Sequence, residues 1–316
     1  MVIVYSENKK IMLELLNGAQ PLAKHLNTKV TAILIGDSSQ ATELIGYGAD
    51  KVITIDTKNL QYQAEPYATY LKQIMEQEKA TTLLIGSTKN GKELAPRIAA
   101  ELDVGCVTDA FNLSFKNNKL TVDRIEYSGN AISTLQFQKS PYILTIPPKL
   151  FTPMEKDTTR KGETTSFTPK DIAYSSKITN VTTQKSESVN VEDAEIIVSC
   201  GRGFKNKEDI KIIQTLADVL KGRTVGCSRP IAADLKWLSE DHWIGLSGHK
   251  VKPKLYIAVG ISGQIQHIAG MRDSSIIVAI NKDPEALIFN SADYGIVGDL
   301  YEVVPKLTTA IKEKMS

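Results

Sequence analysis

The chain has 316 residues, about twice the ~150 residues of a typical domain, so two domains are expected. Its 38 lysines and arginines nearly balance 36 aspartates and glutamates, and the formal charge of +2 excludes the large positive field of a nucleic-acid-binding protein. Apolar residues at 42% and charged residues at 23% exclude long disorder, collagen-like sequence and low complexity.

Short apolar runs of strand length alternate with helical patterns from the start of the chain. The predicted strands are VIVY at 2–5, VTAILIG at 30–36, KVITI at 51–55 and TLLIG at 82–86. A helix is predicted after the first run because apolar residues recur every three or four positions, which places them on one stripe. They are Ile11, Leu15, Ala19, Leu22 and Leu26. Strand–helix–strand repetition predicts a mainly parallel α/β sheet flanked by helices.

Beyond Asp109 the runs become shorter and partly alternate between apolar and polar residues. The runs are LSFKNNKLTV at 113–122, AISTLQFQ at 131–138 and YILTIP at 142–147. Alternation of this kind is typical of antiparallel strands, and we expect all three to be added to the first sheet.

Residues 157–188 are rich in Ser, Thr and Lys and poor in large apolar residues, which marks a connector. We therefore predict an N-terminal α/β domain over 1–190, which includes the connector, and a C-terminal domain over 191–316. Weak alternation in DIAYSSKITNV at 171–181 leaves open whether part of the connector pairs as an edge strand.

The second half returns to the α/β pattern. Its predicted strands are EIIVSCG at 195–201, TVGCS at 224–228, LYIAVG at 255–260 and SIIVAIN at 275–281. A helix over 206–221 is predicted because Asn206 can cap it, Asp209 lies in its electropositive first turn and Gly222 follows its end. A last helix is predicted from about residue 303.

Two glycine loops stand where a predicted strand turns into a helix, GRG at 201–203 and GISG at 260–263. Glycine lets a backbone approach phosphate closely, and helix N-terminal N–H groups favour an anion. Tight turns also use glycine for steric reasons, and GRGFKN lacks the last glycine of the dinucleotide fingerprint. Both loops lie where open α/β sheets bind ligands, at the carboxyl ends of strands, so they form a candidate nucleotide site.

Several polar residues near these loops have two interpretations each. Pro230 disfavours helical geometry at Arg229, so we expect Arg229 to be extended and presented to a ligand; alternatively it pairs with a carboxylate such as Asp234. His267 is either a structural helical histidine or a site residue. Asp299, before the last helix, is either a cap or a site residue.

The sequence lacks a GxSxG elbow, a GxxxxGK[ST] loop and a close pair of carboxylates with a catalytic partner. This favours a nucleotide or dinucleotide binder without hydrolytic machinery. Cys200 and Cys227 lie in apolar strands and are more typical of buried packing than of nucleophiles. The four histidines form neither HExxH nor a His/Cys cluster, so no protein-bound metal is expected.

The cell compartment is predicted from the cysteines and the N-terminus. Cys106, Cys200 and Cys227 lie far apart and lack the spacing of a disulfide framework, which favours a reducing compartment. No basic segment followed by an apolar one opens the chain, and no apolar run approaches the ~20 residues that span a bilayer. We therefore predict a cytoplasmic protein without membrane insertion.

The C-terminal half contains a characteristic series of segments from about Ile196 to Leu307. In order they are GRGFKNKEDIKIIQTLADVL, VGCSRPIAAD, IGLSG, LYIAVGISGQIQHIAGM, VAINKDPEALIFNSADYGIVGDL and VVPKL. The N-terminal half adds STKNGKELAPRIAAELDVGCVTDA at 87–110 and YSGNA at 127–131. In this order and spacing the segments closely resemble the alpha subunit of electron-transfer flavoproteins.

The resemblance implies one subunit of an alpha/beta heterodimer, with FAD held mainly in a doubly wound C-terminal domain. The protein would then be an electron carrier rather than an enzyme. It would accept electrons from dehydrogenases, such as acyl-CoA dehydrogenases, and pass them to a quinone oxidoreductase or similar membrane or soluble acceptor. Carried over residue by residue, the FAD contacts are Arg202, Ser228, Arg229, Gly245, Ser247, Ser262, Gly263, Gln264, Ile265, Gln266, His267, Asn281, Asp299 and Leu300.

These residue types suit the parts of FAD that the resemblance assigns to them. Ser262 and Gly263 suit the pyrophosphate, while Asn281 and Asp299 offer hydrogen bonds to ribose or adenine. A guanidinium at position 229 and the imidazole of the IQH segment would flank the isoalloxazine ring. Since the reduced ring is negatively charged, both favour the electron-bearing forms.

One site segment departs from the family pattern, because Leu246-Ser247 stands where Gln-Thr is usual. Ser247 keeps a hydroxyl for the flavin N5 edge, but Leu246 removes an amide, which implies a shifted potential or a different partner. The alternative functions are a nicotinamide-dependent oxidoreductase on a dinucleotide fold and, from the N-terminal half alone, a nucleotide-binding stress or regulatory module.

Overall fold

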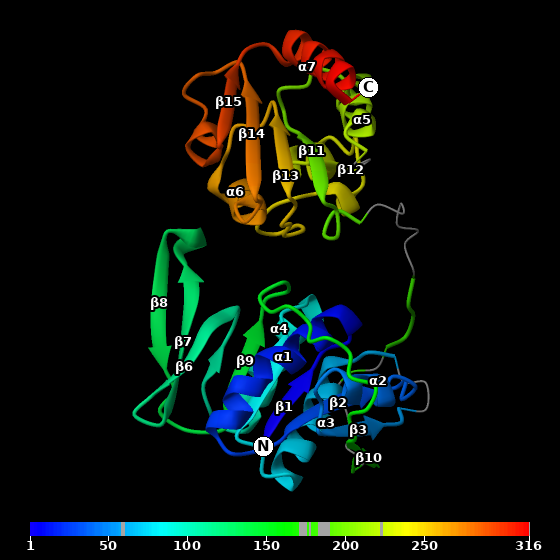
Figure 1. Cartoon of the computed structure of the whole chain (residues 1–316), viewed down its shortest axis with the longest axis vertical. Helices are drawn as coiled ribbons and strands as arrows, with labels where there is room; N and C mark the ends of the chain where they lie inside the picture. The colour runs from blue at the N-terminus through cyan, green and yellow to red at the C-terminus, as the bar shows by residue number, and fades with distance from the viewer. Residues whose placement is uncertain (58–60, 171–175, 177, 183–189, 222–223, 316) are drawn as a thin grey trace. The chain divides into compact units, whose positions relative to one another are not determined.

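The chain is described by a computed structural model over residues 1–57, 61–170, 176, 178–182, 190–221 and 224–315. It divides into two compact units, Met1–Val181 and Thr182–Ser316 (Figure 1). Each is built on a parallel sheet flanked by helices, which confirms the predicted α/β class with two such sheets. The boundary predicted after residue 190 stays a prediction.

The sheet of the 1–181 unit has the strand order β10-β3-β2-β1-β4-β9-β5, and every neighbouring pair is parallel. Its strands are β1 (Val2–Tyr5), β2 (Val30–Ile35), β3 (Lys51–Ile55), β4 (Thr82–Gly86), β5 (Cys106–Val107), β9 (Tyr142–Ile146) and β10 (Glu163–Ser166). The four strands predicted before residue 87 are confirmed. Their apolar runs fill both faces of the sheet, as expected for buried parallel strands.

Helices cover both faces of this sheet. They are α1 (Lys9–His25), α2 (Ala41–Gly46), α3 (Ala64–Gln77) and α4 (Lys89–Glu101). Successive strand residues point to opposite faces, so Val2 and Val4 pack with α1 and α2 while Ile3 and Tyr5 pack with α3 and α4. The predicted stripe of α1 is buried in the first of these layers.

The prediction of three antiparallel additions to this sheet was wrong. YILTIP forms β9, which lies parallel between β4 and β5, because all five residues of the strand are buried and a continuous apolar run suits a strand covered on both faces. The other two runs are antiparallel, as predicted, but they form a separate sheet. It contains β6 (Ala110–Lys116), β7 (Lys119–Glu126) and β8 (Ala131–Gln136), with a 3-10 turn at Tyr127–Gly129 (Figure 1).

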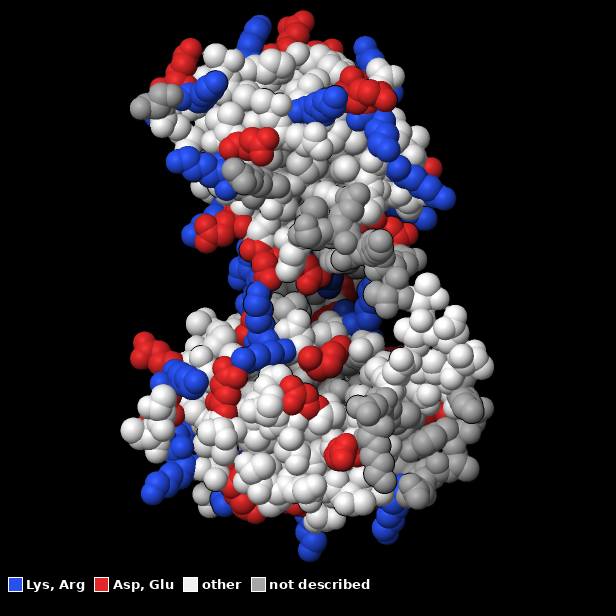
Figure 2. Space-filling model, turned by 90° about the vertical axis from the view of Figure 1, so that its right-hand side faces the viewer, with Lys and Arg blue, Asp and Glu red and all other residues white. Residues whose placement is uncertain are grey.

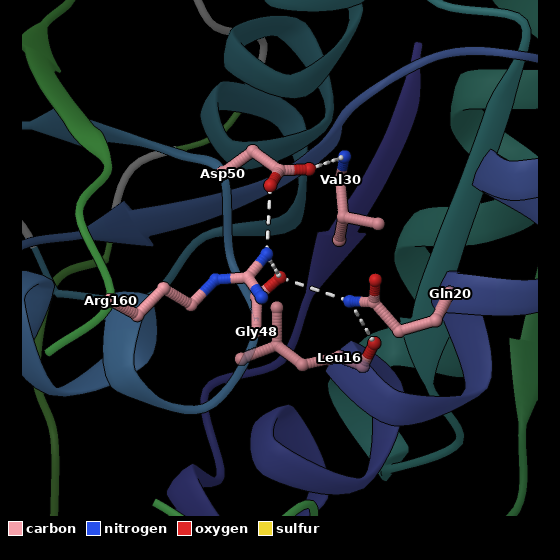
Figure 3. Close-up of polar contacts among 6 residues, drawn as sticks. All are labelled: Leu16, Gln20, Val30, Gly48, Asp50 and Arg160. Atoms are coloured by element: carbon pink, nitrogen blue, oxygen red, sulfur yellow. Dashed lines mark hydrogen bonds and ion pairs between the residues drawn. The ribbon is translucent and has the colours of Figure 1, made fainter. Parts of the chain in front are cut away.

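Part of the connector pairs as an edge strand, since β10 lies parallel to β3. Arg160, just before β10, donates to Asp50 Oδ1 at 2.8 Å and to the Gly48 carbonyl at 3.1 Å (Figure 3). Asp50 in turn accepts from the Val30 N–H at 2.9 Å, and Gln20 donates to the same Gly48 carbonyl. These bonds hold the connector at the sheet edge. Most of DIAYSSKITNV lies outside the described residues.

The 182–316 unit has one parallel sheet in the order β12-β11-β13-β14-β15. Its strands are β11 (Ile196–Cys200), β12 (Thr224–Cys227), β13 (Leu255–Val259), β14 (Ile276–Asn281) and β15 (Tyr294–Val297). The first four confirm predicted strands, and β15 was not predicted. Helices α5 and α7 pack on one face and α6 on the other, which confirms the doubly wound arrangement.

Two of the three helices in the described part of this unit follow a side-chain cap, either directly or through a 3-10 turn. The helices are α5 (Lys211–Val219), α6 (Ile265–Met271) and α7 (Leu300–Met315), with a π-helical turn at Pro230–Asp234 and 3-10 turns at Lys207–Ile210, Glu240–His242 and Leu287–Ser291. Asn206 and Asp209 form the predicted cap, but a 3-10 turn precedes α5, and Gly222 lies outside the described residues. The last helix begins three residues earlier than expected, because the Asp299 carboxylate accepts from the Tyr301 N–H at 2.8 Å.

Charged side chains of both signs are interspersed over the face shown in Figure 2. Within the described ranges, the helices are too short or too polar for any of them to cross a bilayer.

Candidate functional site

The predicted site residues gather at one edge of the 182–316 sheet. Each of its five strands contributes where it ends. Arg202 follows β11, Ser228 and Arg229 follow β12, Ser262 to Gln266 follow β13, Asn281 ends β14, and Asp299 and Leu300 follow β15. All five strands are parallel, so these positions share the carboxyl edge, where open α/β sheets bind ligands.

The two predicted glycine loops touch each other through their backbones. The Gly203 N–H donates to the Gly260 carbonyl at 3.0 Å. A Cβ on Gly201 would lie 2.4 Å from the Gly260 oxygen, and one on Gly203 would lie 2.8 Å from the Gly260 Cα. Leu300 packs beside them and is buried. The glycines of the GRG turn are therefore required by the contact between the two loops.

Gly263 is locked against the 3-10 turn at Leu287–Ser291. It has φ +81°, and a Cβ there would lie 2.1 Å from the Ile288 nitrogen, which itself donates to the Ser262 carbonyl at 3.2 Å. Asn281 braces the same loop, because its amide donates to the Ile261 carbonyl at 2.9 Å and accepts from the Asp283 N–H at 3.0 Å. These contacts fix the path of residues 261–263 before α6 begins.

The turn that holds Gly245 and Ser247 packs against the start of α6. The Leu246 N–H donates to the Gln266 carbonyl at 2.6 Å, and the Gly245 N–H donates to the His249 carbonyl at 3.1 Å. A Cβ on Gly270 would lie 2.5 Å from the Gly245 Cα, so only glycines permit this approach. Ser247 is exposed, and the Leu246 side chain is 44% exposed.

The predicted extended conformation of Arg229 was wrong. Its φ of −44° and ψ of −48° are helical, because the Ile231 N–H donates to the Ser228 carbonyl at 3.0 Å and closes a turn over residues 228–231. Pro230 then occupies the first position of the following helical turn, where its missing N–H costs nothing. The guanidinium carbon lies 6.0 Å from the Trp243 ring centroid. The ion pair with Asp234 that we considered is not among the pairs of the described residues.

His267 is buried on α6, and its Nε2 lies 2.9 Å from the Tyr256 hydroxyl oxygen. Burial lowers the pKa of His267 to about 4, with the backbone of Ile244 acting in the opposite direction. The ring is therefore neutral near pH 7. It offers a hydrogen bond to the site rather than a positive charge.

Six exposed polar side chains at this edge have no hydrogen bond or ion pair with the part of the chain that the structure describes. We call them the free polar set, and they are Arg202, Arg229, Ser247, Ser262, Gln264 and Gln266. Asn281 and Asp299 differ, since the protein itself already engages their side chains. Two guanidiniums, two hydroxyls and two amides on one rigid edge suit an anionic ligand with several polar groups.

The cysteines near this edge are packing residues. Cys200 and Cys227 are register partners on β11 and β12, and both are fully buried. Burial raises the pKa of Cys200 to about 12 and also raises that of Cys227. Burial likewise raises the pKa of Cys106 to about 11. Thiols that stay protonated are poor nucleophiles, so these residues stabilise the core.

Three residues that shape the site were missed in the sequence, namely Trp243, Tyr256 and Ile288. The Trp243 ring lies beside the Arg229 guanidinium, Tyr256 hydrogen-bonds His267, and Ile288 requires glycine at position 263. A signal existed for two of them. Trp243 is one of only two tryptophans and stands just before IGLSG, and Tyr256 is the polar residue inside the apolar strand LYIAV.

Known families and relatives match almost the whole chain. The electron transfer flavoprotein domain matches residues 2–172, and the electron transfer flavoprotein FAD-binding domain matches residues 190–272. The electron transfer flavoprotein subunit alpha of Bacillus subtilis (strain 168) is 43% identical over 288 residues, which cover 90% of this chain and 88% of the relative. The same subunit from Thermoanaerobacterium thermosaccharolyticum is 41% identical over 323 residues, covering 99% and 97%. Protein FixB from an Escherichia coli O7:K1 strain is 38% identical over 313 residues, covering 98% and 97%.

The chain therefore belongs to the electron transfer flavoprotein family, which confirms the predicted resemblance. Its cofactor is FAD, and it is an electron carrier rather than an enzyme. Both family matches are flavoprotein domains, so neither the nicotinamide-dependent oxidoreductase nor the separate nucleotide-binding module gains support. The FAD-binding match ends at residue 272, before Asn281, Asp299 and Leu300.

Proposed function

We propose that the free polar set and the two glycine loops hold FAD at the carboxyl edge of the 182–316 sheet. The observation that carries this proposal is that six exposed polar side chains lie along this edge without partners in the described chain. Exposed side chains without partners in the protein can exchange their hydrogen bonds with water for hydrogen bonds to a ligand. The buried Nδ1 of His267, which has no hydrogen-bond partner among the described residues, fits the same interpretation.

The diphosphate of FAD would lie between the GRG and GISG loops. Arg202 and Ser262 are exposed on these loops and offer a charged fork and a hydroxyl, which are the groups that bind phosphate oxygens. Gln264 and Gln266 add amides along the same edge. Asn281 contributes by holding the Ile261 carbonyl, so its role is to support the loop as well as to contact the adenosine half.

The flavin ring would lie near Arg229, Ser247 and His267. Bound FAD supplies the reversible uptake of one or two electrons. Arg229, held beside Trp243, offers a fixed positive charge that stabilises added negative charge. Ser247 offers a hydroxyl on a turn that the Gln266 carbonyl anchors, and His267 offers a neutral hydrogen-bonding ring. None of these three residues has a proposed role in making or breaking a bond of a substrate.

The assembly proposed is a heterodimer with an electron-transfer flavoprotein beta subunit. Two of the relatives carry the name subunit alpha, which supports a second subunit. Dehydrogenases, with acyl-CoA dehydrogenases as one class, would donate electrons, and a quinone oxidoreductase or similar protein would accept them. Three free cysteines support the cytoplasm as the compartment.

Expression of the chain with and without a beta subunit tests this function. We expect the chain alone to bind FAD weakly or to aggregate, and the co-expressed pair to purify as a yellow one-to-one complex. A stable monomer that holds stoichiometric FAD, unchanged by any partner subunit, would overturn the heterodimer. A folded complex that takes up no FAD would overturn the cofactor site.

A further inference from the structure

The Tyr301 hydroxyl joins the GRG loop, the start of α7 and the cap that precedes α5. Tyr301 is the second residue of α7, and its hydroxyl accepts from the Lys205 N–H at 2.8 Å. The same hydroxyl donates to Asp209 Oδ2 at 2.7 Å. That oxygen also accepts from the Asn206 N–H at 3.0 Å. One side chain of α7 therefore holds the chain just beyond the GRG loop, directly at Lys205 and through Asp209 at Asn206.

The direction of each hydrogen bond in this cluster follows from groups that have a single role. A backbone N–H only donates, so the Tyr301 oxygen accepts from Lys205. The hydrogen bond from Tyr301 lowers the pKa of Asp209, so its carboxylate is ionised near neutral pH and only accepts. The Tyr301 hydroxyl thus makes one bond as acceptor and one as donor, both within the protein.

The Tyr301 ring is packed as well as hydrogen-bonded. It lies edge-on to the ring of Phe204, with centroids 6.3 Å apart and an angle of 64°, and Phe204 is buried. The Lys205 ammonium nitrogen lies 5.4 Å from the Tyr301 ring centroid. Contacts of both kinds are favourable. They fix the ring, and with it the hydroxyl, relative to the GRG loop.

Arg202 stands between this anchor and a second one. The Gly203 N–H donates to the Gly260 carbonyl at 3.0 Å, which attaches the GRG loop to the GISG loop. Tyr301 attaches the residues after the loop to α7. A glycine on either side of Arg202 gives the backbone more conformational freedom than other residues would, so the position of the guanidinium depends on these anchors.

The backbone of Tyr301 reaches another part of the proposed site. Its N–H donates to the Asp299 carboxylate at 2.8 Å, and Leu300, between them, packs beside both glycine loops. Tyr301 therefore connects the residues that follow β15 with the loop that follows β11.

We infer, on the basis of the proposed FAD site, that Tyr301 is a positioning residue that fixes the GRG loop and presents Arg202 to the diphosphate of FAD. A loop that is fixed before the ligand arrives loses less conformational entropy on binding, which increases the affinity. The contact with the ligand itself is made by Arg202.

A double-mutant cycle on the full-length chain with its beta subunit tests this inference, with FAD affinity measured by fluorescence titration of the FAD-depleted complex. Tyr301→Phe keeps the ring and should weaken FAD binding about twofold to tenfold, the worth of one hydrogen bond. Arg202→Ala should weaken it about tenfold to hundredfold, because a charge-assisted contact is lost. In the double variant the loss should equal that of Arg202→Ala alone. Losses that multiply would overturn the inference, since Tyr301 would then act independently of Arg202.

Tyr294→Phe is the matched control, because Tyr294 is 65% exposed and begins β15, at the opposite edge of the same sheet. It should leave FAD affinity unchanged in both the wild-type and the Arg202→Ala complex. Normal affinity in Tyr301→Phe beside weakened binding in Arg202→Ala would overturn the inference alone. A wild-type complex that takes up no FAD would overturn the proposed function instead.

Amide hydrogen exchange of the wild-type complex adds a measurement that needs no variant. The Lys205 amide should exchange slowly both before and after FAD removal, because its acceptor belongs to the protein. Fast exchange at Lys205 without FAD and slow exchange with FAD would overturn the inference, because the ligand rather than Tyr301 would then order the loop.

Discussion

The two units differ in how the polar side chains at the carboxyl edges of their parallel sheets are hydrogen-bonded. At the carboxyl edge of the 1–181 sheet, several polar side chains bond one another: Asp109 accepts from Ser87 at 2.5 Å and from Lys92 at 2.8 Å, and Glu7 accepts from Thr88 at 2.7 Å. At the carboxyl edge of the 182–316 sheet, the free polar set has no such partners in the described chain.

The difference supports the FAD site proposed at the carboxyl edge of the 182–316 sheet. A parallel sheet always places helix starts and loop residues at its carboxyl edge, so topology alone makes both edges candidates. A ligand would have to break hydrogen bonds within the protein at the first edge, whereas at the second edge it needs only to replace water on exposed side chains. The pairing of polar side chains therefore distinguishes the two edges, and the following experiments test that distinction.

The largest effect is expected from Gly263→Ala, because the new Cβ would lie 2.1 Å from the Ile288 nitrogen at a residue with φ +81°. Crowding and the unfavourable backbone conformation together should lower the free energy of unfolding by about 2 to 6 kcal/mol. Urea unfolding followed by tryptophan fluorescence reports on this unit, since both tryptophans, Trp237 and Trp243, lie in it.

Gly298→Ala is the matched control for this measurement. Its Cβ would meet only a methyl group of the Val303 side chain, which can move, so a loss below about 0.5 kcal/mol is expected. Equal losses of unfolding free energy in Gly263→Ala and Gly298→Ala would contradict the close contact between Gly263 and Ile288. A glycine variant at position 263 is unsuited to probing FAD directly, since loss of fold and loss of cofactor would coincide.

Acid should destabilise the 182–316 unit through His267. The folded pKa of about 4 lies below the usual value of 6.5, so between these values the unfolded chain binds the extra proton. The free energy of unfolding should therefore fall by roughly 3 kcal/mol as the pH drops from 6.5 to 4. Below pH 4 the histidine is protonated in both the folded and the unfolded chain, so it contributes no further loss. Tryptophan-monitored unfolding across this range measures it, and His267→Asn should remove the slope. Identical slopes in both proteins would refute the assignment.

Arg229→Ala should lower the first one-electron potential of the bound flavin. A charge-assisted contact is worth about 1.5 to 3 kcal/mol, which corresponds to a shift of about 60 to 130 mV. Arg229→Lys should recover only part of it, because an ammonium lacks the planar fork. Spectroelectrochemical titration of the complex gives the potentials, and Arg97→Ala, at a surface ion pair of the other unit, is the control. An unchanged first potential in Arg229→Ala would show that Arg229 has only a structural role.

The smallest effects are expected from the hydroxyls of the free polar set. Ser262→Ala and Ser247→Ala should each weaken FAD binding about twofold to tenfold, the worth of one neutral hydrogen bond. Fluorescence titration of the FAD-depleted complex measures the affinity. Thr309→Ala serves as control, because the Thr309 hydroxyl already bonds the Pro305 carbonyl within α7. Loss of affinity in the control but not in the serine variants would place the cofactor elsewhere.

Much of the fold could be predicted because apolar runs report burial directly. Continuous runs such as KVITI and TLLIG predicted their strands, and the capping residues Asn206 and Asp299 predicted helix starts within a few residues. The exception was YILTIP. This run is buried as continuously as the others. Because the runs just before it alternate between apolar and polar residues, it was wrongly predicted to be antiparallel.

Local patterns predicted which sheet edge carries the candidate site residues, but not how those residues contact one another. The glycine loops and the carboxyl edge follow from local patterns, but the conformation of Arg229 depends on a turn closed by Ser228 and Ile231. The Gly263 requirement arises from Ile288, which is 25 positions away in the sequence. Contacts of that range leave no periodic signal, so only the folded structure shows them.

Amide hydrogen exchange of the full-length chain in its complex, with and without FAD, tests the central claim most directly. FAD should slow exchange at residues 201–203, 228–229, 245–249 and 262–266 and leave residues 86–92 and 109 unchanged. Protection confined to the edge that contains Ser87 and Asp109, with none around Gly203 and Ser262, would contradict the account.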